Sequence, residues 1–338
     1  NNAAFGEQAL SNDTNGFYST AFGHAALANQ NFSSSTGAYN TAVGYNAGLQ
    51  VTTGIHNILI GGLAGDALTT GQANASNVAL GANALDANTT GNSNVALGYN
   101  SMSTETTGSG NVSVGTNALA AQNTAAVSYN TAVGHNAGLS LQYGVKNTFI
   151  GGLSGDANTT ASNNTAVGYT SLGANTTASN NTAVGTDALA ANTTGGENIA
   201  LGAFAGQSIT TGTNNILIGY AAGSHNVSTT TGSGNIIIGN YADTTTVASA
   251  YANVIGYNVS GAGGYTTIGQ SGSDIRAQHG VASWLTTSDQ RYKKDIVDST
   301  AGLSFINALR PRTFKYKTLG ELPETFSAYE ADSTKVFK

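Results

Sequence analysis

Apolar and polar positions alternate over short stretches along most of the chain, and one pattern recurs. Each stretch has Asn, a β-former or Thr, a small residue, a large apolar residue and Gly, as in residues 40–44 and 181–185. Alternation with period two predicts a three-residue strand with one face in a core. Because the residue before Gly is large in each motif, we expect that position to be the buried one. The expected buried column includes Val43, Leu97, Val133, Val184 and Ile218.

The motif returns at a nearly fixed spacing. Most closing glycines are seventeen residues apart, and the remaining gaps are longer by two to four residues. A coil of fixed length with loop insertions produces this spacing, whereas seventeen residues cannot hold two helices and their turns. The sequence therefore predicts an all-β fold, a parallel β-solenoid over residues 1–260 that is roughly 70 Å long at about 4.8 Å per coil.

Individual motif positions suggest distinct structural roles. The opening Asn is expected to form a ladder of amides between stacked coils, because a ligand-binding residue has no reason to recur in every coil. The closing Gly is expected to need a positive φ or a close approach between chains. The small central residue, as at Ala79 and Ala132, is expected to face a neighbouring chain. Polar side chains expected at the surface include Asp13, Asp66 and Glu105.

Composition narrows the class of protein. Charged residues make up only 8% of the chain, with 45 Gly and 2 Pro in 338 residues, which is also typical of a disordered polar tract. The strict apolar periodicity argues against disorder. The absence of Cys excludes disulfides and thiolate metal sites, and we expect no cofactor and no metal. The chain has no apolar run of about 18 residues and no signal pattern at its start, so we expect no membrane insertion.

Charge is distributed unevenly along the chain. Before Arg276 the only basic residue is Lys146, against ten acidic residues, whereas ten basic residues face seven acidic ones from Arg276 onward. A shaft with a single Lys cannot neutralise a phosphate backbone, so nucleic acid is not an expected partner. The change of composition places a neck or linker at 261–287 and a separate domain at 288–338.

The coils resemble two families of trimeric fibres. Their motif is similar to that of the left-handed parallel β-rolls in trimeric autotransporter adhesin heads, and to the Asn-Thr-Ala-Val-Gly-Tyr-Asn-Ala repeats of phage tail fibres. The resemblance implies a homotrimer in an extracellular virion tail, joined to other tail proteins upstream, that adheres to a host receptor such as a glycan. A narrow coil has too little core to stand alone, which also favours a trimer.

Two alternatives remain open. A bacterial trimeric adhesin at the cell surface would carry similar coils but normally ends in a membrane-anchoring barrel. An ice-binding solenoid is suggested by the recurring Thr, although ice binders need a flat face of regularly paired Thr. The chain begins within a repeat, and we expect an upstream attachment region in the natural protein.

The segment 288–296, Ser-Asp-Gln-Arg-Tyr-Lys-Lys-Asp-Ile, resembles the opening of the intramolecular chaperone at the C-termini of endosialidases and phage tail fibres. A helix is expected at 299–309, because Leu303, Ile306 and Leu309 have helical spacing, and a strand at 313–316. Residues 288–338 are therefore expected to be the start of a small α+β chaperone domain, without its later part.

The chaperone resemblance implies self-cleavage by a Ser-Lys dyad. Ser288 takes the position of the cleaving residue and Lys293 that of its partner. A Ser hydroxyl needs a base, and a Lys serves only if burial lowers its pKa. Cleavage after Ser288 would require help from Asp289. The structural alternative is a helix cap at Ser288 and a solvated Lys293. The reaction would occur once, in cis, without substrate turnover.

Two further sets of residues are candidates for chemistry. Aromatic residues follow the motif Gly in several coils, either as packing residues or as receptor contacts for a sugar. The candidates are Tyr45, Tyr99, Tyr169 and Tyr220. Asp66 and Asp86 occupy equivalent places on neighbouring coils and could form the carboxylate pair of a retaining glycosidase. We favour solvated turn residues, because no Arg precedes Arg276 to clamp a charged sugar.

Overall fold

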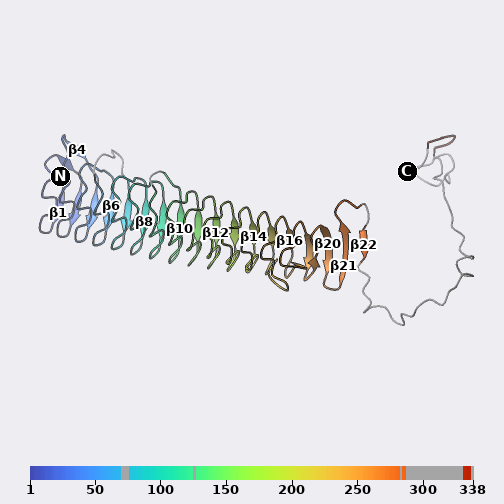
Figure 1. The fold of residues 1–338 in the computed structure, drawn as a ribbon. Coiled ribbons are helices and arrows are strands. Elements are labelled where there is room, and N and C mark those ends of the chain that lie inside the picture. The colour runs from blue at the N-terminus through green and yellow to red at the C-terminus, as the bar shows by residue number, and fades with distance from the viewer. Residues whose placement is uncertain (70–75, 125–126, 282–283, 287–329, 336–338) are drawn as a thin grey trace, which may run out of the picture. The chain divides into compact units, whose positions relative to one another are not determined.

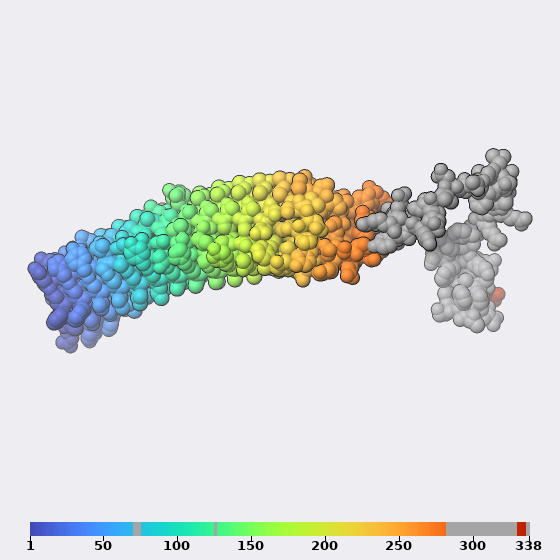
Figure 2. Space-filling model, turned by 90° about the horizontal axis from the view of Figure 1, so that it is seen from below, coloured from blue at the N-terminus to red at the C-terminus, as the bar shows by residue number. Residues whose placement is uncertain are grey.

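The computed structural model describes residues 1–69, 76–124, 127–281, 284–286 and 330–335. The chain divides into two compact units, Asn1–Thr287 and Ser288–Lys338. The first unit is an elongated parallel β-solenoid (Figures 1 and 2). No helix occurs in the described residues, which confirms the predicted all-β solenoid with coils of about seventeen residues.

One sheet runs the length of the solenoid. It contains eighteen strands, and each coil contributes one strand that pairs in parallel with the strands of the coils before and after it. The parallel strands are β1 (Ala3–Phe5), β3 (Thr20–Phe22), β5 (Thr41–Val43), β6 (Ile58–Ile60), β7 (Val78–Leu80), β8 (Val95–Leu97), β9 (Val112–Val114), β10 (Thr131–Val133), β11 (Thr148–Ile150), β12 (Thr165–Val167), β13 (Thr182–Val184), β14 (Ile199–Leu201), β15 (Ile216–Ile218), β16 (Ile236–Ile238), β18 (Asn253–Tyr257) and β20 (Tyr265–Gln270).

The sheet ends in antiparallel strands. β21 (Ser273–Gln278) pairs with β20, and β22 (Trp284–Thr286) pairs with β21, so segment 261–287 contains strands that extend the solenoid sheet. Two small parallel pairs lie elsewhere in the coils. They are β2 (Gly16–Phe17) with β4 (Thr36–Gly37), and β17 (Asp243–Thr244) with β19 (Ser260–Gly261).

Strand register aligns equal motif positions. Thr165 pairs with Thr182, Ala166 with Ala183 and Val167 with Val184, and the same rule holds from coil to coil. Each motif position therefore forms a column along the solenoid, and its side chains all face the same way.

The inward column differs from the predicted one. The central residue of each strand is buried, as at Ala42 and Ala132, whereas Val43 and Val133 are only half-buried and Val184 is 37% exposed. Leu97 and Ile218 are likewise half-buried. The prediction of a buried column before Gly was wrong because it assigned the larger side chain to the core. The core instead draws its bulk from residues such as Leu172 in the following turn, and in coils with such a Leu the strand centre is a small residue, as at Ala166.

Exceptions at the central position show that core volume is conserved between coils. Phe149 replaces Ala at the centre of β11 and is fully buried. Gly155 and Gly138 stand where other coils have Leu172 and Leu119. A Cβ on Gly155 would lie 2.5 Å from the Phe149 ring, and one on Gly138 would lie 2.8 Å from it. Glycine in its own turn and in that of the preceding coil therefore makes room for Phe149 in β11.

The asparagine ladder is confirmed, with a more specific geometry than stacked amides. The side-chain Oδ1 of Asn164 accepts the backbone N–H of Asn181 at 2.9 Å, and its Nδ2 donates to the carbonyl of Ala178 at 2.9 Å. The same Oδ1 contact to the next backbone N–H runs through successive coils from Asn40 to Asn235. Each Asn therefore binds the backbone of the next coil, several of them also tie down their own turn through Nδ2, and all are buried.

The acidic residues predicted at the surface are more buried than expected. Asp13 and Asp66 are half-buried, and Glu105 is fully buried, which contradicts the prediction. The Glu105 carboxylate accepts the N–H of Gly108 at 2.7 Å and the Nε2 of Gln122 at 3.0 Å. Its coil position carries buried Leu141 or Ile209 in other coils, so this position faces the core regardless of residue type.

Candidate functional site

The four tyrosines proposed as receptor contacts share one column but lie apart. Each follows a motif Gly, and they are 42% to 58% exposed. They stand just after β5, β8, β12 and β15, so at least two other coils separate each from the next. The structure therefore confirms that they are exposed but does not bring them together as one site.

One of them, Tyr220, belongs to a larger group of rings, here called the aromatic cluster. Its ring centroid lies 5.5 Å from that of Phe204 and 5.3 Å from that of Tyr241. Tyr241 also lies 4.4 Å from His225 and 6.0 Å from Tyr257. The rings meet edge to face or at a tilt, and Tyr220, Tyr257 and His225 are exposed.

A buried carboxylate holds His225 in the aromatic cluster. Asp243 Oδ2 accepts the backbone N–H of His225 at 3.1 Å, of Asn226 at 2.8 Å and of Val227 at 3.0 Å. These residues belong to an insertion that lengthens the coil between Asn215 and Asn235 to twenty residues. Sequence reasoning missed this cluster because it treated the insertion as a tolerated loop. The concentration of aromatic residues between 204 and 257 was the available signal.

A second, smaller stack lies near the N-terminal end of the sheet. The rings of Tyr18 and Tyr39 are 5.1 Å apart, and those of Tyr39 and His56 are 5.5 Å apart. Another pair, His24 and Tyr45, is stacked at 5.4 Å on the column after the motif Gly. These stacks form because equal coil positions repeat at the coil spacing.

Asp66 and Asp86 occupy the same position of adjacent coils, as expected. Burial raises the pKa of Asp66. Burial also raises the pKa of Asp86, and the neighbouring charge of Asp66 raises it further. The pKa of Asp156, at the same position of a distant coil, is likewise raised by burial. The raised pKa therefore belongs to the coil position, and it does not identify a catalytic pair.

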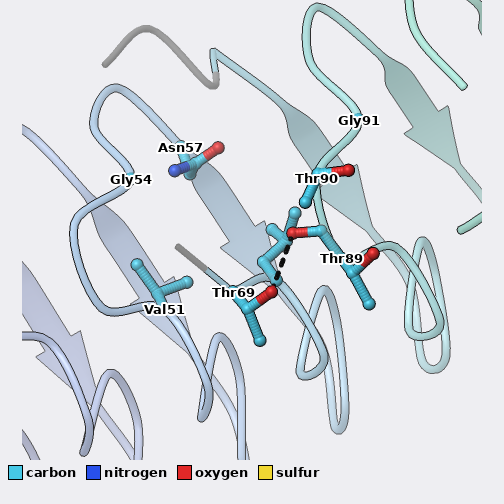
Figure 3. A pocket seen from close by; sticks show the side chains of 8 residues that line it. Val51, Gly54, Asn57, Thr69, Thr89, Thr90 and Gly91 are labelled. Carbon is cyan, nitrogen blue, oxygen red and sulfur yellow. Dashed lines mark hydrogen bonds between the residues drawn. The ribbon is translucent and has the colours of Figure 1, made fainter. Parts of the chain in front are cut away.

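A small pocket lies close to these carboxylates but contains no ionisable side chain (Figure 3). Thr69 donates its hydroxyl to the carbonyl of Thr89 at 3.3 Å across it. Without a carboxylate, imidazole or amine, the pocket offers no general base. Its lining consists of Val51, Gly54, Asn57, Leu68, Thr69, Thr89, Thr90 and Gly91.

The proposed cleavage residues Ser288, Asp289 and Lys293 lie outside the described residues, as do the expected helix at 299–309 and strand at 313–316. Within the described ranges, no group of three or more His, Asp or Glu side chains could hold a metal ion. The same part of the chain contains no helix long and apolar enough to cross a membrane.

Comparison with known families gives a match at the C-terminal end. Residues 288–333 match the model of the family described as chaperone of endosialidase. The match falls within the second compact unit, Ser288–Lys338. The searches of curated proteins and of solved structures found no match to the chain.

Proposed function

We infer that this chain, with a chaperone of endosialidase match at residues 288–333, is a structural and host-adhesion component of a bacteriophage tail fibre. In this proposal residues 1–260 are the shaft of a homotrimer, 261–287 the neck and 288–338 the start of a self-cleaving trimerisation chaperone. The carrying observation is the chaperone-family segment directly after a solenoid of about fifteen coils. It favours a phage fibre over a bacterial adhesin, because the resemblance of this segment is to chaperones at the C-termini of endosialidases and phage tail fibres.

The chaperone has a physical purpose in a repetitive fibre. Every coil resembles its neighbours, so three chains could align one coil out of register with nearly the same local contacts. A slipped trimer would be a kinetic trap. A distinctive domain at one end that trimerises first would fix the register and let the coils pair progressively along the fibre.

Self-cleavage would use the two residues that the chaperone resemblance identifies. Neutral Lys293 would accept the proton of the Ser288 hydroxyl, whose Oγ attacks the carbonyl carbon of Thr287. The bond between Thr287 and Ser288 breaks, the amine of Ser288 is released with a proton, and water hydrolyses the resulting ester. Cleavage after Ser288, assisted by Asp289, is the alternative.

Ser288→Ala is expected to abolish cleavage and leave a soluble, uncleaved trimer. Lys293→Ala is expected to slow cleavage by about a hundredfold or more, because a missing general base typically costs 10²–10⁴ in rate. Lys294→Ala is the matched control and should cleave at the normal rate. Gel mobility, intact mass and terminal sequencing read the outcome and locate the bond. An uncleaved wild-type chain would show that the dyad does not act in this chain.

For host adhesion, the aromatic cluster is the best-supported contact surface. Exposed rings offer apolar faces to sugar rings, and the cluster presents several within one coil spacing of each other. We assign the receptor contact to Tyr220 and its ring neighbours, with Tyr45, Tyr99 and Tyr169 as weaker candidates because they lie isolated from one another along the column.

The adhesion proposal predicts carbohydrate binding that depends on the aromatic cluster. On an array of bacterial surface polysaccharides, Tyr220→Ala and Tyr241→Ala are each expected to weaken binding about tenfold. Tyr143→Ala is the control, because Tyr143 is exposed, is none of the candidate contacts and has no ring contact within the described part of the chain. Equal losses in all three variants, or no bound saccharide at all, would contradict the assignment.

A further inference from the structure

The outward side of the long sheet is uncharged from β1 to β16, and its third strand position is apolar in every coil. We define the outer face as the first and third residues of the three-residue parallel strands from β1 to β16. Every one of them is Ala, Thr, Val, Leu, Ile or Phe, and none is charged. The closing residues of β7 and β14, Leu80 and Leu201, are 47% and 37% exposed.

Several large side chains of the outer face lie open to solvent, while others, such as Leu97, are half-buried. Phe5 and Phe22, at one end, stack with their ring centroids 4.9 Å apart and are 69% and 53% exposed. Ile58 and Ile150, farther along, are 42% and 39% exposed. Contiguous apolar patches of more than a few hundred Å² are rare on monomeric soluble proteins and mark interaction surfaces. The outer face is therefore incomplete in a single chain.

The periodicity of the outer face limits what can cover it. The face repeats once per coil, about every 4.8 Å, over the whole ladder of strands. A globular partner would cover only a few coils and leave the remainder exposed. A partner that covers every coil must have the same repeat and the same length, and a second copy of this chain meets both conditions.

Symmetry determines how copies can meet through this face. Packing around an axis parallel to the solenoid closes the assembly and keeps the chaperone-family segments of all chains at one end. It also places each residue opposite its own equivalents, so that the bulky Phe22 meets Phe22 and not a Thr of another coil. An antiparallel pair would separate those C-terminal segments.

We propose that the outer face is the surface through which three copies of this chain pack around a common axis, parallel and in register. This inference rests on the homotrimer of the proposed function and adds the surface that forms it. It reverses the sequence-based expectation that the Ala positions contact neighbouring chains, because Ala166 and Ala183 lie inside the coil and are fully buried. The Val, Leu and Ile beside them form the contact.

Cysteine cross-linking tests the surface directly, because the chain has no Cys of its own. Ile199→Cys and Leu201→Cys place a thiol at either end of β14, where both side chains are more than a third exposed in one chain. Thr194→Cys is the matched control, an exposed residue in the turn before β14. The full-length variants are purified and then oxidised. Disulfide-linked dimers are quantified on a non-reducing gel, and the native mass of each variant is measured in parallel.

The expected result is a native mass of three chains, with strong cross-linking at residue 199 or 201 and little at 194. A three-chain mass with cross-linking at 194 and none at 199 or 201 would overturn the proposed surface and leave the homotrimer intact. A single-chain mass for wild type would overturn the homotrimer and the surface together. If Ile199→Cys or Leu201→Cys loses the three-chain mass while Thr194→Cys keeps it, that result also supports the proposal, even without a cross-link.

Discussion

Replacing Gly151 with alanine is expected to destabilise the solenoid around β11 by about 3 kcal/mol or more, because two separate penalties act at this site. Its φ is +134°, a conformation that L side chains rarely adopt. An added Cβ would also lie 2.3 Å from the carbonyl oxygen of Gly168, on the next coil. That oxygen belongs to a backbone fixed by the strand ladder and cannot move away without breaking it.

Gly152→Ala is the matched control at the neighbouring position. Gly152 has no positive φ in the strained range, and an added Cβ would meet the Tyr169 ring at 3.6 Å, an ordinary contact. We expect nearly unchanged stability for this variant. Thermal unfolding and hydrogen exchange of the β11 and β12 amides compare the two. Similar losses in both variants would show that close coil stacking at the motif Gly is not the cause.

Removal of the C-terminal segment is expected to prevent correct assembly, whereas blocking cleavage is not. Deletion from Trp284 onward should give aggregated or misregistered chains, because nothing then fixes which coils pair. Deletion from Ser288 onward is the sharper variant, since it keeps β22 paired with β21. Ser288→Ala retains the chaperone-family segment and should give a soluble trimer.

Size-exclusion chromatography with light scattering separates these outcomes. We expect polydisperse or aggregated material from both deletions and a single three-chain species from Ser288→Ala. If the chain lacking residues 288–338 assembles into the same trimer with the same yield, the segment has no role in setting the register.

The repeat carried most of the fold information. Asn164 and its equivalents predicted the ladder because identical amides recur at the coil spacing, and the structure shows that their Oδ1 atoms accept the backbone N–H of the next coil. Gly151 and its equivalents predicted a positive φ or a close approach of the backbone, and the structure shows both. These predictions succeeded because they depend on one coil and its nearest neighbour.

The inward and outward directions could not be read from the strand alone. A three-residue strand with Val, Ala and Val has the same period whichever face is buried, and the larger side chains suggested the wrong one. The deciding residues, such as Leu172, lie in the turn that follows and fill the core first. Glu105 was misplaced for the same reason, because its inward position is evident only beside Leu141 and Ile209 in the same column.

The candidate sites depended on different kinds of information. The exposure of Tyr220 followed from its coil position, but its ring partner His225 comes from an insertion whose path depends on hydrogen bonds to Asp243. Ser288 and Lys293 were identified by family resemblance, and the matched segment 288–333 supports that resemblance. Their roles as nucleophile and base remain predictions for the cleavage experiment.

Native mass spectrometry of the purified, full-length wild-type chain shows whether this solenoid exists as three chains packed together. We expect one species with three times the mass of the chain, or of its fragment if cleavage has occurred. A species with the mass of one chain, stable at concentrations where its apolar outer face would be exposed, would contradict it.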